Sequence, residues 1–180
     1  VGATATESPM ALDGETALLA RLEAIRQAAS VAMGITADLA QAASVPSAPK
    51  VAFVAPPAAS MALDGSVLGE SDVDLLARMI SVGAPHRAIP LTGGLCTAVA
   101  AKITGTIVHE AARAGREGRV GQPSGTTVVD ADVYQRENGA WHAETASVVR
   151  TQRRLMDGFV YVSAEKTPGL DTSNISQAAE

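Results

Sequence analysis

The residues best suited to chemistry lie between His86 and Lys102, where a basic, proline-containing approach leads into a Thr-Gly-Gly turn. Thr92 is suited to be the N-cap of a helix over residues 94–103, and the two glycines that follow let a ligand approach the backbone closely. The first turn of a helix has unpaired N–H groups and the positive end of the helix dipole, so it can bind a carboxylate or phosphate. The segment therefore predicts an anion site. For Thr-Gly-Gly alone, a core helix with a glycine-rich entry is the more common explanation.

The predicted helix has no polar face. Small and apolar side chains cover most of its circumference: Leu95, Cys96, Ala98, Val99, Ala100, Ala101 and Ile103. This pattern predicts complete burial, with the rest of the chain wrapped around the helix. Cys96 is then small buried packing, which is the more common role of such a cysteine, and it is a weak candidate for an acid or base.

Two polar residues precede the turn. Arg87 would offer a forked contact to a carboxylate, and His86 would offer a neutral donor. The alternative interpretation makes both of them surface residues before the Pro90 turn.

Other charged and imidazole groups carry less information. His109 and His142 lie in strand-like segments without carboxylate or cysteine companions, so they predict structural roles and no metal site. Arg150, Arg153 and Arg154 are typical of a solvated connection, with the alternative that one of them reaches a ligand-binding cleft.

Composition limits the class of protein. The chain has 180 residues, enough for one domain with a real core or two small ones, and 47% of them are hydrophobic but only 3% aromatic. A formal net charge of -5 without a basic block argues against a nucleic-acid partner. The single cysteine suits a reducing cytoplasm, and no apolar run is long enough for a membrane span. Because residue 1 is valine and lies in a loop-like segment, we expect a fragment of something longer.

Periodicity and turn residues predict the elements before the central helix. Asp13 caps a helix over residues 15–33 that ends at Gly34. Residues 37–49 are a connector, 49–57 a short buried strand and 61–69 a turn or hairpin. Residues 72–82 suit a helix and a strand equally well.

The second half is predicted to be antiparallel β structure. A strand begins at Thr106 and runs to about residue 112. Further strands cover residues 126–134, 140–149 and 158–162, with an Asn138-Gly139 hairpin signal, and residues 163–180 form a flexible tail. One apolar helix with several short antiparallel strands predicts an α+β fold, with a curved sheet around a buried helix.

Five motifs, taken in order and spacing, closely resemble the C-terminal half of the PrpF family, which includes methylaconitate isomerases and oxalomesaconate tautomerases. They are Pro85-His86-Arg87-Ala88, Leu91-Thr92-Gly93-Gly94-Leu95-Cys96-Thr97-Ala98, Gly105-Thr106-Ile107-Val108, Gln122-Pro123-Ser124-Gly125 and the stretch from Val149 to Val162. Thr6-Glu7-Ser8-Pro9 and the first helix also fit.

The resemblance implies a diaminopimelate-epimerase-like fold with two similar lobes, each a curved sheet around a central helix, and the substrate between them. It implies that residues 1–162 are the C-terminal lobe, that residues 163–180 are a tail, and that 72–82 is a strand. The substrate-binding residues it implies are His86, Arg87, Thr92, Gly93, Gly94, Ser124 and Gly125.

The implied reaction moves a proton across an allylic system in an unsaturated di- or tricarboxylic acid, and it requires neither a cofactor nor a metal. The acid and base are expected in an N-terminal lobe that is absent here, because Lys50, Lys102 and Lys166 match no such motif. The chain alone is therefore expected to be inactive. The expected partners are a small polycarboxylate, the absent lobe and, as a possible homo-oligomer, a second copy of the protein. The expected location is the cytoplasm. The alternatives are a carboxylate-binding lobe without chemistry and an amino-acid racemase or epimerase of the same fold. Leu91 or Thr92 in place of a cysteine counts against the last.

Overall fold

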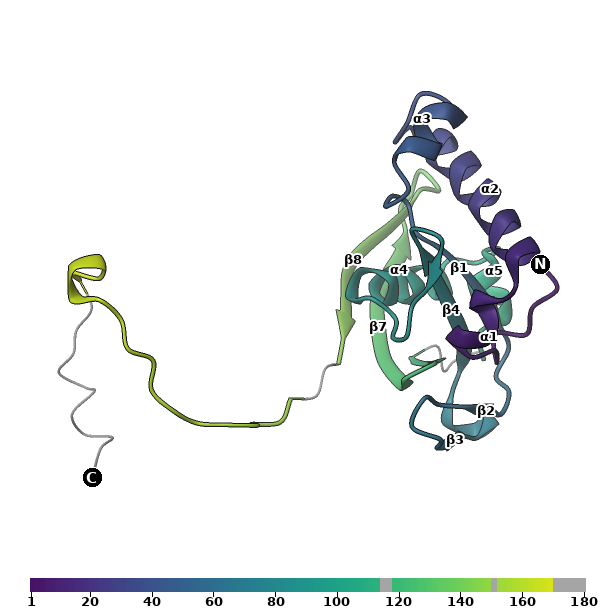
Figure 1. The fold of residues 1–180 in the computed structure, drawn as a ribbon. Coiled ribbons are helices and arrows are strands. Elements are labelled where there is room, and N and C mark those ends of the chain that lie inside the picture. Colours follow the sequence, from purple (N-terminus) through teal and green to yellow (C-terminus); the bar gives the residue numbers. More distant parts are fainter. Residues whose placement is uncertain (114–117, 150–151, 170–180) are drawn as a thin grey trace. The chain divides into compact units, whose positions relative to one another are not determined.

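The computed structural model describes residues 1–113, 118–149 and 152–169, and it divides the chain into one compact unit, 1–150, and a second unit, 151–180. The helices, including two short 3-10 turns, are α1 (Pro9–Asp13), α2 (Thr16–Ala32), α3 (Leu39–Ser44), η1 (Glu70–Asp72), α4 (Leu91–Lys102), α5 (Ile107–Ala111) and η2 (Ala164–Lys166). The strands are β1 (Val51–Ala55), β2 (Ser60–Met61), β3 (Val67–Leu68), β4 (Leu75–Ser81), β5 (Ala84–Pro85), β6 (Arg119–Gln122), β7 (Gly125–Gln135) and β8 (Trp141–Val148) (Figure 1).

Strand β4 is the centre of the compact unit, because both of its faces are buried. Leu76 and Ile80 pack into one core with residues of α1 and α2. Ala77 and Met79 point the other way, into a second core that includes residues of α4 and β7. The sheet is therefore sandwiched between α1 and α2 on one face and α4 on the other (Figure 1). Segment 72–82 is a strand, as the resemblance implied.

The sheet is mostly antiparallel, as predicted. Its order is β1-β4-β6-β7-β8, with β5 paired to β4, and β2 and β3 form a separate hairpin. The β4–β6 pair is parallel, with Leu75 opposite Val120. A parallel pair needs a crossover connection, and here that connection contains α4 and α5, which places α4 on the face of the sheet.

A buried ion pair fixes the β4–β6 junction. Asp74, only 2% exposed, precedes β4. Its Oδ2 accepts hydrogen bonds from the Arg119 backbone N–H and Nε at 2.9 and 3.0 Å, and its Oδ1 accepts one from Nη2 at 2.7 Å. The Arg119 carbonyl in turn accepts from the Asp74 N–H at 2.7 Å. The starts of the two parallel strands are therefore held together by charge and by backbone.

Three short helices were not predicted, and each begins at a capping side chain. The Ser8 hydroxyl accepts from the Ala11 N–H before α1, and the Asp38 carboxylate accepts from the Gln41 N–H before α3. Thr106 caps α5 in the same way, so the strand predicted over 106–112 is wrong. N-cap bonds satisfy otherwise unpaired N–H groups, and here they outweigh the β-branched residues that favoured a strand. The prediction of Asp13 as the cap of α2 is also wrong, because Asp13 ends α1 and the N-cap is Glu15.

The prediction that α4 is buried on every side is wrong. Its inner residues, among them Gly94, Thr97 and Ala98, are buried, but Leu91 is 52% exposed and Cys96 is exposed. The apolar pattern of the helix is uniform, whereas the sheet covers only one side of it. The helix therefore has an apolar face without cover among the described residues.

No strand forms over 158–162, so this prediction is also wrong for the described chain. The segment has the β-branched and aromatic residues of a strand, but Phe159 is 66%, Val160 87% and Tyr161 100% exposed. A strand needs a neighbour for its backbone groups, and the described residues supply none here. The predicted tail begins with the short turn η2, and residues 170–180 lie outside the described part.

The β4–β5 hairpin leads to a testable prediction. Its two turn residues, Val82 and Gly83, have φ of 51° and 75°. A β-branched residue is strained in this left-handed region, where asparagine is accepted. Val82 is 60% exposed, so its side chain contributes little packing. We expect Val82→Asn to raise the free energy of unfolding by about 1 kcal/mol in urea titrations. Val67→Asn, at another exposed valine, is the control; an equal gain there would contradict this explanation.

Candidate active-site region

Helix α4 begins earlier than the sequence predicted. Its N-cap is Pro90, with φ -64° and ψ 150°, and Thr92 is the second helical residue rather than the cap. Proline fits this boundary because it lacks the N–H that a helix start leaves unpaired. The first helical hydrogen bond runs from the Gly94 N–H to the Pro90 carbonyl at 2.9 Å. The amides of Leu91, Thr92 and Gly93 therefore precede the helical bonding and can serve an anion.

The two glycines let α4 lie close to the sheet. Both are buried. A Cβ atom at Gly93 would lie 2.6 Å from the Sδ of Met79, and one at Gly94 would lie 3.4 Å from the Val129 Cγ1. Gly94 thus packs against β7 and has its N–H bonded within the helix, so Gly93, and not Gly94, is the glycine whose amide can reach a ligand.

The loop before α4 is tied to the corner between β6 and β7. The buried Gln122 accepts through Oε1 from the backbone N–H of Ile89 and of Ser124, both at 3.2 Å. The Ser124 hydroxyl donates to the Arg87 carbonyl at 2.5 Å. The sequence predicts Ser124 and Arg87 as separate ligand contacts, and the structure brings them together. The role of Gln122 was not predicted, because its only signal was its place in the Gln-Pro-Ser-Gly motif.

The predicted ligand-binding side chains on the loop before α4 differ in exposure and in hydrogen bonding. The Arg87 side chain is exposed, and the described residues give its guanidinium no hydrogen bond or ion pair. His86 is half-buried; its backbone N–H donates to the Met79 carbonyl at 2.8 Å, and its Nε2 is enclosed without a partner. Gly125 has φ 113°, which closes the corner. Arg87 is therefore the group on this loop that is free to pair with a carboxylate.

A hollow of about 410 Å³ opens beside the start of α4. Its wall includes Thr92, Gly93 and Cys96 from α4, Met33 after α2, and Lys50 before β1. Lys50 is exposed, and none of the described residues forms an ion pair with it. No sequence motif pointed to Lys50, because it comes to α4 only through the fold. The hollow thus combines unpaired helix-start amides with a cation and a thiol.

The exposure of Cys96 changes the expectation for its role. A thiol in contact with solvent contributes little to packing, so we expect Cys96→Ala to change the free energy of unfolding by less than about 0.5 kcal/mol. Chemical denaturation of both proteins measures this difference. A loss of several times that size would restore the packing role that the sequence suggested.

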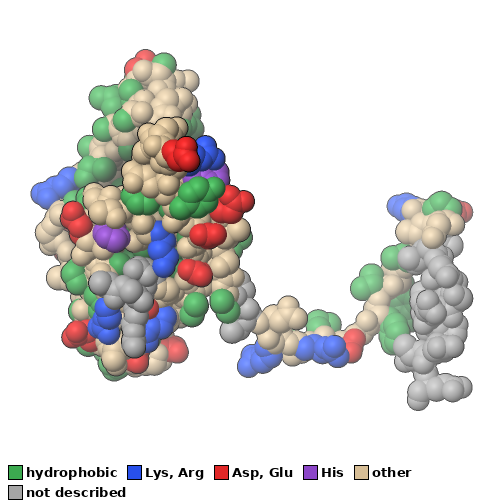
Figure 2. Space-filling model, turned by 180° about the vertical axis from the view of Figure 1, so that it is seen from behind, with side chains coloured by type: hydrophobic (Ala, Val, Ile, Leu, Met, Phe, Trp, Pro, Cys, Tyr) green, Lys and Arg blue, Asp and Glu red, His purple; other side chains and the backbone are tan. Residues whose placement is uncertain are grey.

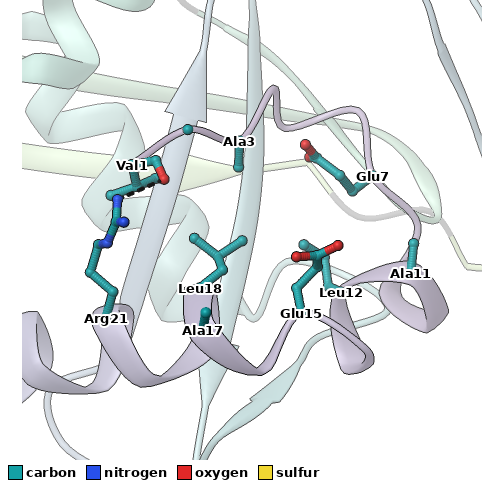
Figure 3. A pocket seen from close by; sticks show the side chains of 10 residues that line it. Val1, Ala3, Glu7, Ala11, Leu12, Glu15, Ala17, Leu18 and Arg21 are labelled. Atoms are coloured by element: carbon teal, nitrogen blue, oxygen red, sulfur yellow. Dashed lines mark hydrogen bonds between the residues drawn. The ribbon is translucent and has the colours of Figure 1, made fainter.

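A second hollow, of about 450 Å³, lies between the N-terminal loop and helices α1 and α2 (Figure 3). It is lined by the carboxylates of Glu7 and Glu15, and Arg21 donates from Nη1 to the Val1 carbonyl at 3.1 Å rather than facing a ligand. Two carboxylates make it unsuited to an anion. None of the predicted substrate-binding residues lines it, so the start of α4 remains the candidate site.

Arg78 has a structural role beside the N-terminal loop. Arg78 of β4 is 2% exposed and donates from Nε to the Glu7 carbonyl at 2.8 Å. Burial lowers the pKa of Arg78 to about 10, and the charge of Glu7 acts in the opposite direction. At neutral pH Arg78 is therefore charged and anchors the loop that contains Thr6-Glu7-Ser8-Pro9.

The other histidines have partners within the structure. His109 Nδ1 lies 2.8 Å from the Ala101 carbonyl, and His142 Nε2 lies 3.1 Å from Glu144. Across residues 1–113, 118–149 and 152–169, no three His, Cys, Asp or Glu side chains are placed to hold a metal ion. Within the same ranges, no helix is long and apolar enough to cross a bilayer. On the face seen in Figure 2, acidic and basic side chains are interspersed.

The family is decided by a match to the model described as PrpF protein, which covers residues 1–163. The chain belongs to the PrpF family. The match contains all seven predicted site residues and the loops that position them.

Several PrpF relatives have assigned names. A 2-methyl-aconitate isomerase of Shewanella oneidensis is 40% identical over 164 residues, covering 90% of this chain and 41% of the relative. One from Cupriavidus necator is 36% identical, covering 92% and 42%. A 3-methylitaconate isomerase of Eubacterium barkeri is also 36% identical, covering 92% and 44%. The PrpF chain therefore spans less than half of the length of these relatives.

The fold agrees with that of a solved relative. A crystal structure of methylitaconate-delta-isomerase superposes with a TM-score of 0.74 at 34% identity, covering 91% of this PrpF chain and 42% of that one. The α+β lobe of diaminopimelate-epimerase type is therefore confirmed. The predicted curvature of its sheet is present, although the described part of the sheet covers only one side of α4.

Proposed function

We propose that this chain is the C-terminal lobe of an isomerase that moves a proton, and with it a double bond, in an unsaturated di- or tricarboxylic acid. The observation that carries the proposal is the 36–40% identity to methylaconitate and methylitaconate isomerases over 90–92% of this chain. In this proposal the cleft between the two lobes selects among methylaconitate, oxalomesaconate and related acids.

The proposed role of this lobe is to hold a carboxylate. The amides of Leu91, Thr92 and Gly93 point out of the helix start, and Arg87 offers a guanidinium beside them in sequence. Together they supply a fixed dipole and a mobile charge to the same anion. Ser124 and Gln122 hold the loop in place, so the hydroxyl of Ser124 contributes through the position of Arg87.

The reaction needs a base, an acid and stabilisation of the delocalised dienolate that forms between the two proton transfers. Helix-start amides and Arg87 can stabilise that negative charge, because the carboxylate they bind is conjugated to the reacting carbons. Proton transfer of this kind uses no electron carrier, so we propose a cofactor-independent reaction. We place the acid and base in the other lobe. If the chain alone catalyses exchange, Lys50 and Cys96 are the candidate acid and base within it.

Exchange of substrate protons with deuterated solvent tests the proposal. The chain is mixed with a polypeptide containing the part of the Shewanella relative that it does not match, and 2-methylaconitate is followed by proton NMR. We expect exchange at an allylic carbon only when both polypeptides are present. Binding without exchange would favour a carboxylate-binding lobe, and exchange by the chain alone would place the base here.

The racemase or epimerase alternative has its own outcome in the same mixture. Such an enzyme would exchange the α-proton of an amino acid, and it would leave the allylic position of 2-methylaconitate unlabelled. Amino-acid exchange without allylic exchange would overturn the isomerase proposal.

A further inference from the structure

The hollow beside the start of α4 has one charged side chain among its lining residues, that of Lys50. Thr92 and Gly93, whose amides precede the helical bonding, line the same hollow. Most of the remaining wall is apolar, and it consists of Ala29, Met33, Ala48, Pro49 and Met79. The hollow therefore combines two groups that attract an anion with a surface that suits a carbon skeleton.

The backbone of Lys50 is held on both sides. Val51, the next residue, begins β1 and pairs with Ile80 of β4. On the other side, the guanidinium of Arg26 binds the Ala48 carbonyl. A lysine side chain is long and flexible, so the fixed backbone at its base decides where its charge can reach.

Arg26 of α2 makes this connection from inside the protein, since it is only 2% exposed. Its Nη1 donates to the carbonyls of Val45 and Ala48 at 3.2 and 3.1 Å, and its Nη2 donates to the Ala42 carbonyl at 2.6 Å. Nε and Nη2 also donate to the Glu23 carboxylate at 2.8 and 2.7 Å. A buried guanidinium is costly unless such bonds satisfy it, and three of these bonds fix the segment that leads to Lys50.

We propose that Lys50 binds a second carboxylate of the substrate in the hollow beside α4, and that Arg26 is the positioning residue for Lys50. The first carboxylate is the one assigned to the helix-start amides and Arg87. A dicarboxylate then places its carbon skeleton along the apolar wall, whereas a monocarboxylate leaves Lys50 unpaired. The inference deepens the proposed function by naming the group that selects acids with two or more carboxylates. It rests on the proposed carboxylate site, but not on the proposed proton transfer.

Two saturated acids test the role of Lys50 without any reaction. 2-Methylsuccinate has two carboxylates, and 2-methylbutanoate has a methyl group in place of the second one. Calorimetry measures the affinity of each acid for this chain combined with the part of the Shewanella relative that it does not match. We expect the wild type to bind 2-methylsuccinate roughly ten- to a hundred-fold more tightly, which is the effect of one charge-assisted hydrogen bond. Lys50→Gln should remove most of that preference.

Two variants control for charge. Lys166→Gln removes the same charge at an exposed lysine that does not line the hollow, and it should keep the preference for 2-methylsuccinate. Lys50→Arg retains a cation in the hollow and should keep most of the preference, whereas an arginine could not replace a lysine that acts as a base.

Arg26→Lys tests the positioning role. The lysine keeps the charge beside Glu23, but it has fewer donors and no fork for the three carbonyls. It should weaken the binding of 2-methylsuccinate and leave the binding of 2-methylbutanoate unchanged, because only the second carboxylate depends on the position of Lys50. Circular dichroism checks that the variant is folded. Equal weakening for both acids would mean a general structural role and would overturn the positioning role.

The outcomes separate this inference from the proposed function. A wild type that binds both acids equally, or a Lys50→Gln variant that keeps the preference, would overturn the assignment of Lys50 even if 2-methylaconitate exchanges its protons. A preference for 2-methylsuccinate that depends on Lys50, without proton exchange in 2-methylaconitate, would support the inference while contradicting the reaction.

Discussion

Asp74→Asn is expected to lower the free energy of unfolding by about 2–4 kcal/mol. Asp74 is buried, and its carboxylate accepts three hydrogen bonds from Arg119. The asparagine amide keeps the shape of the carboxylate but has no charge. Its NH2 group is a donor and would face an N–H donor of Arg119. Arg119 is one-third exposed, so water recovers part of the loss. Urea denaturation at pH 7 measures the difference.

Asp132→Asn is the control for this experiment, because Asp132 is an exposed carboxylate of β7. We expect it to change the stability by less than about 0.5 kcal/mol. If the two variants had equal stability, the Asp74–Arg119 pair would not hold β4 and β6 together.

The same pair predicts a pH dependence. Burial alone would raise the pKa of Asp74, but the hydrogen bonds from Arg119 and the charges of Arg119 and Arg113 lower that pKa below its usual value. A group whose pKa is lower in the folded state stabilises the fold above its unfolded pKa, about 3.9, and loses that contribution as the pH falls through the folded value. The stability difference between wild type and Asp74→Asn should therefore shrink below about pH 4. Unfolding titrations from pH 7 to 3 would show this, and a constant difference would contradict it.

For the proposed two-lobe isomerase, Arg87→Ala should reduce kcat/KM by about ten- to a hundred-fold, which corresponds to the roughly 1.5–3 kcal/mol of a charge-assisted hydrogen bond. The described residues give its guanidinium no partner, so a substrate carboxylate is the group we expect it to serve. Arg87→Lys keeps the charge but not the fork, and it should recover only part of the loss. The measurement is turnover of 2-methylaconitate by the reunited polypeptides.

Arg136→Ala provides the comparison, since Arg136 lies at the β7–β8 turn and contacts His142. It should leave kcat/KM unchanged. Equal losses in both variants would mean that overall charge, and not a contact made by Arg87, attracts the substrate.

The sequence determined those elements whose cause is local. Helix α2 ends where Gly34 takes φ 69°, and the β7–β8 hairpin turns at Gly139 with φ 80°. These are positions where glycine has a conformational advantage over other residues. The proposal of an anion site at the α4 start also comes from the sequence, since unpaired amides follow from any helix start. Five ordered motifs were sufficient to identify the family.

Segments with two consistent patterns needed the tertiary structure. Strand β4 is buried on both faces, between the α2 core and the α4 core, so apolar residues do not alternate along it and periodicity could not separate strand from helix. In α5 the local pattern pointed to the wrong element. Ile107 and Val108 favoured a strand, but the Thr106 cap and the hydrogen bond from its hydroxyl to the Ala100 carbonyl stabilise a helix.

Burial and the composition of the site were decided only by tertiary structure. The apolar residues of α4 indicate that the helix is packed against other elements, but the position of the sheet decides which side of the helix is buried. Lys50 lines the hollow beside α4 and Gln122 ties down the loop before it, and neither residue type at its own position signals that it lies beside the candidate site. Segment 158–162 shows the same limit, because its residues favour a strand while a strand exists only where another backbone lies beside it. Local sequence fixes what each segment can form, and the neighbours that only the fold brings together decide which of those possibilities is realised.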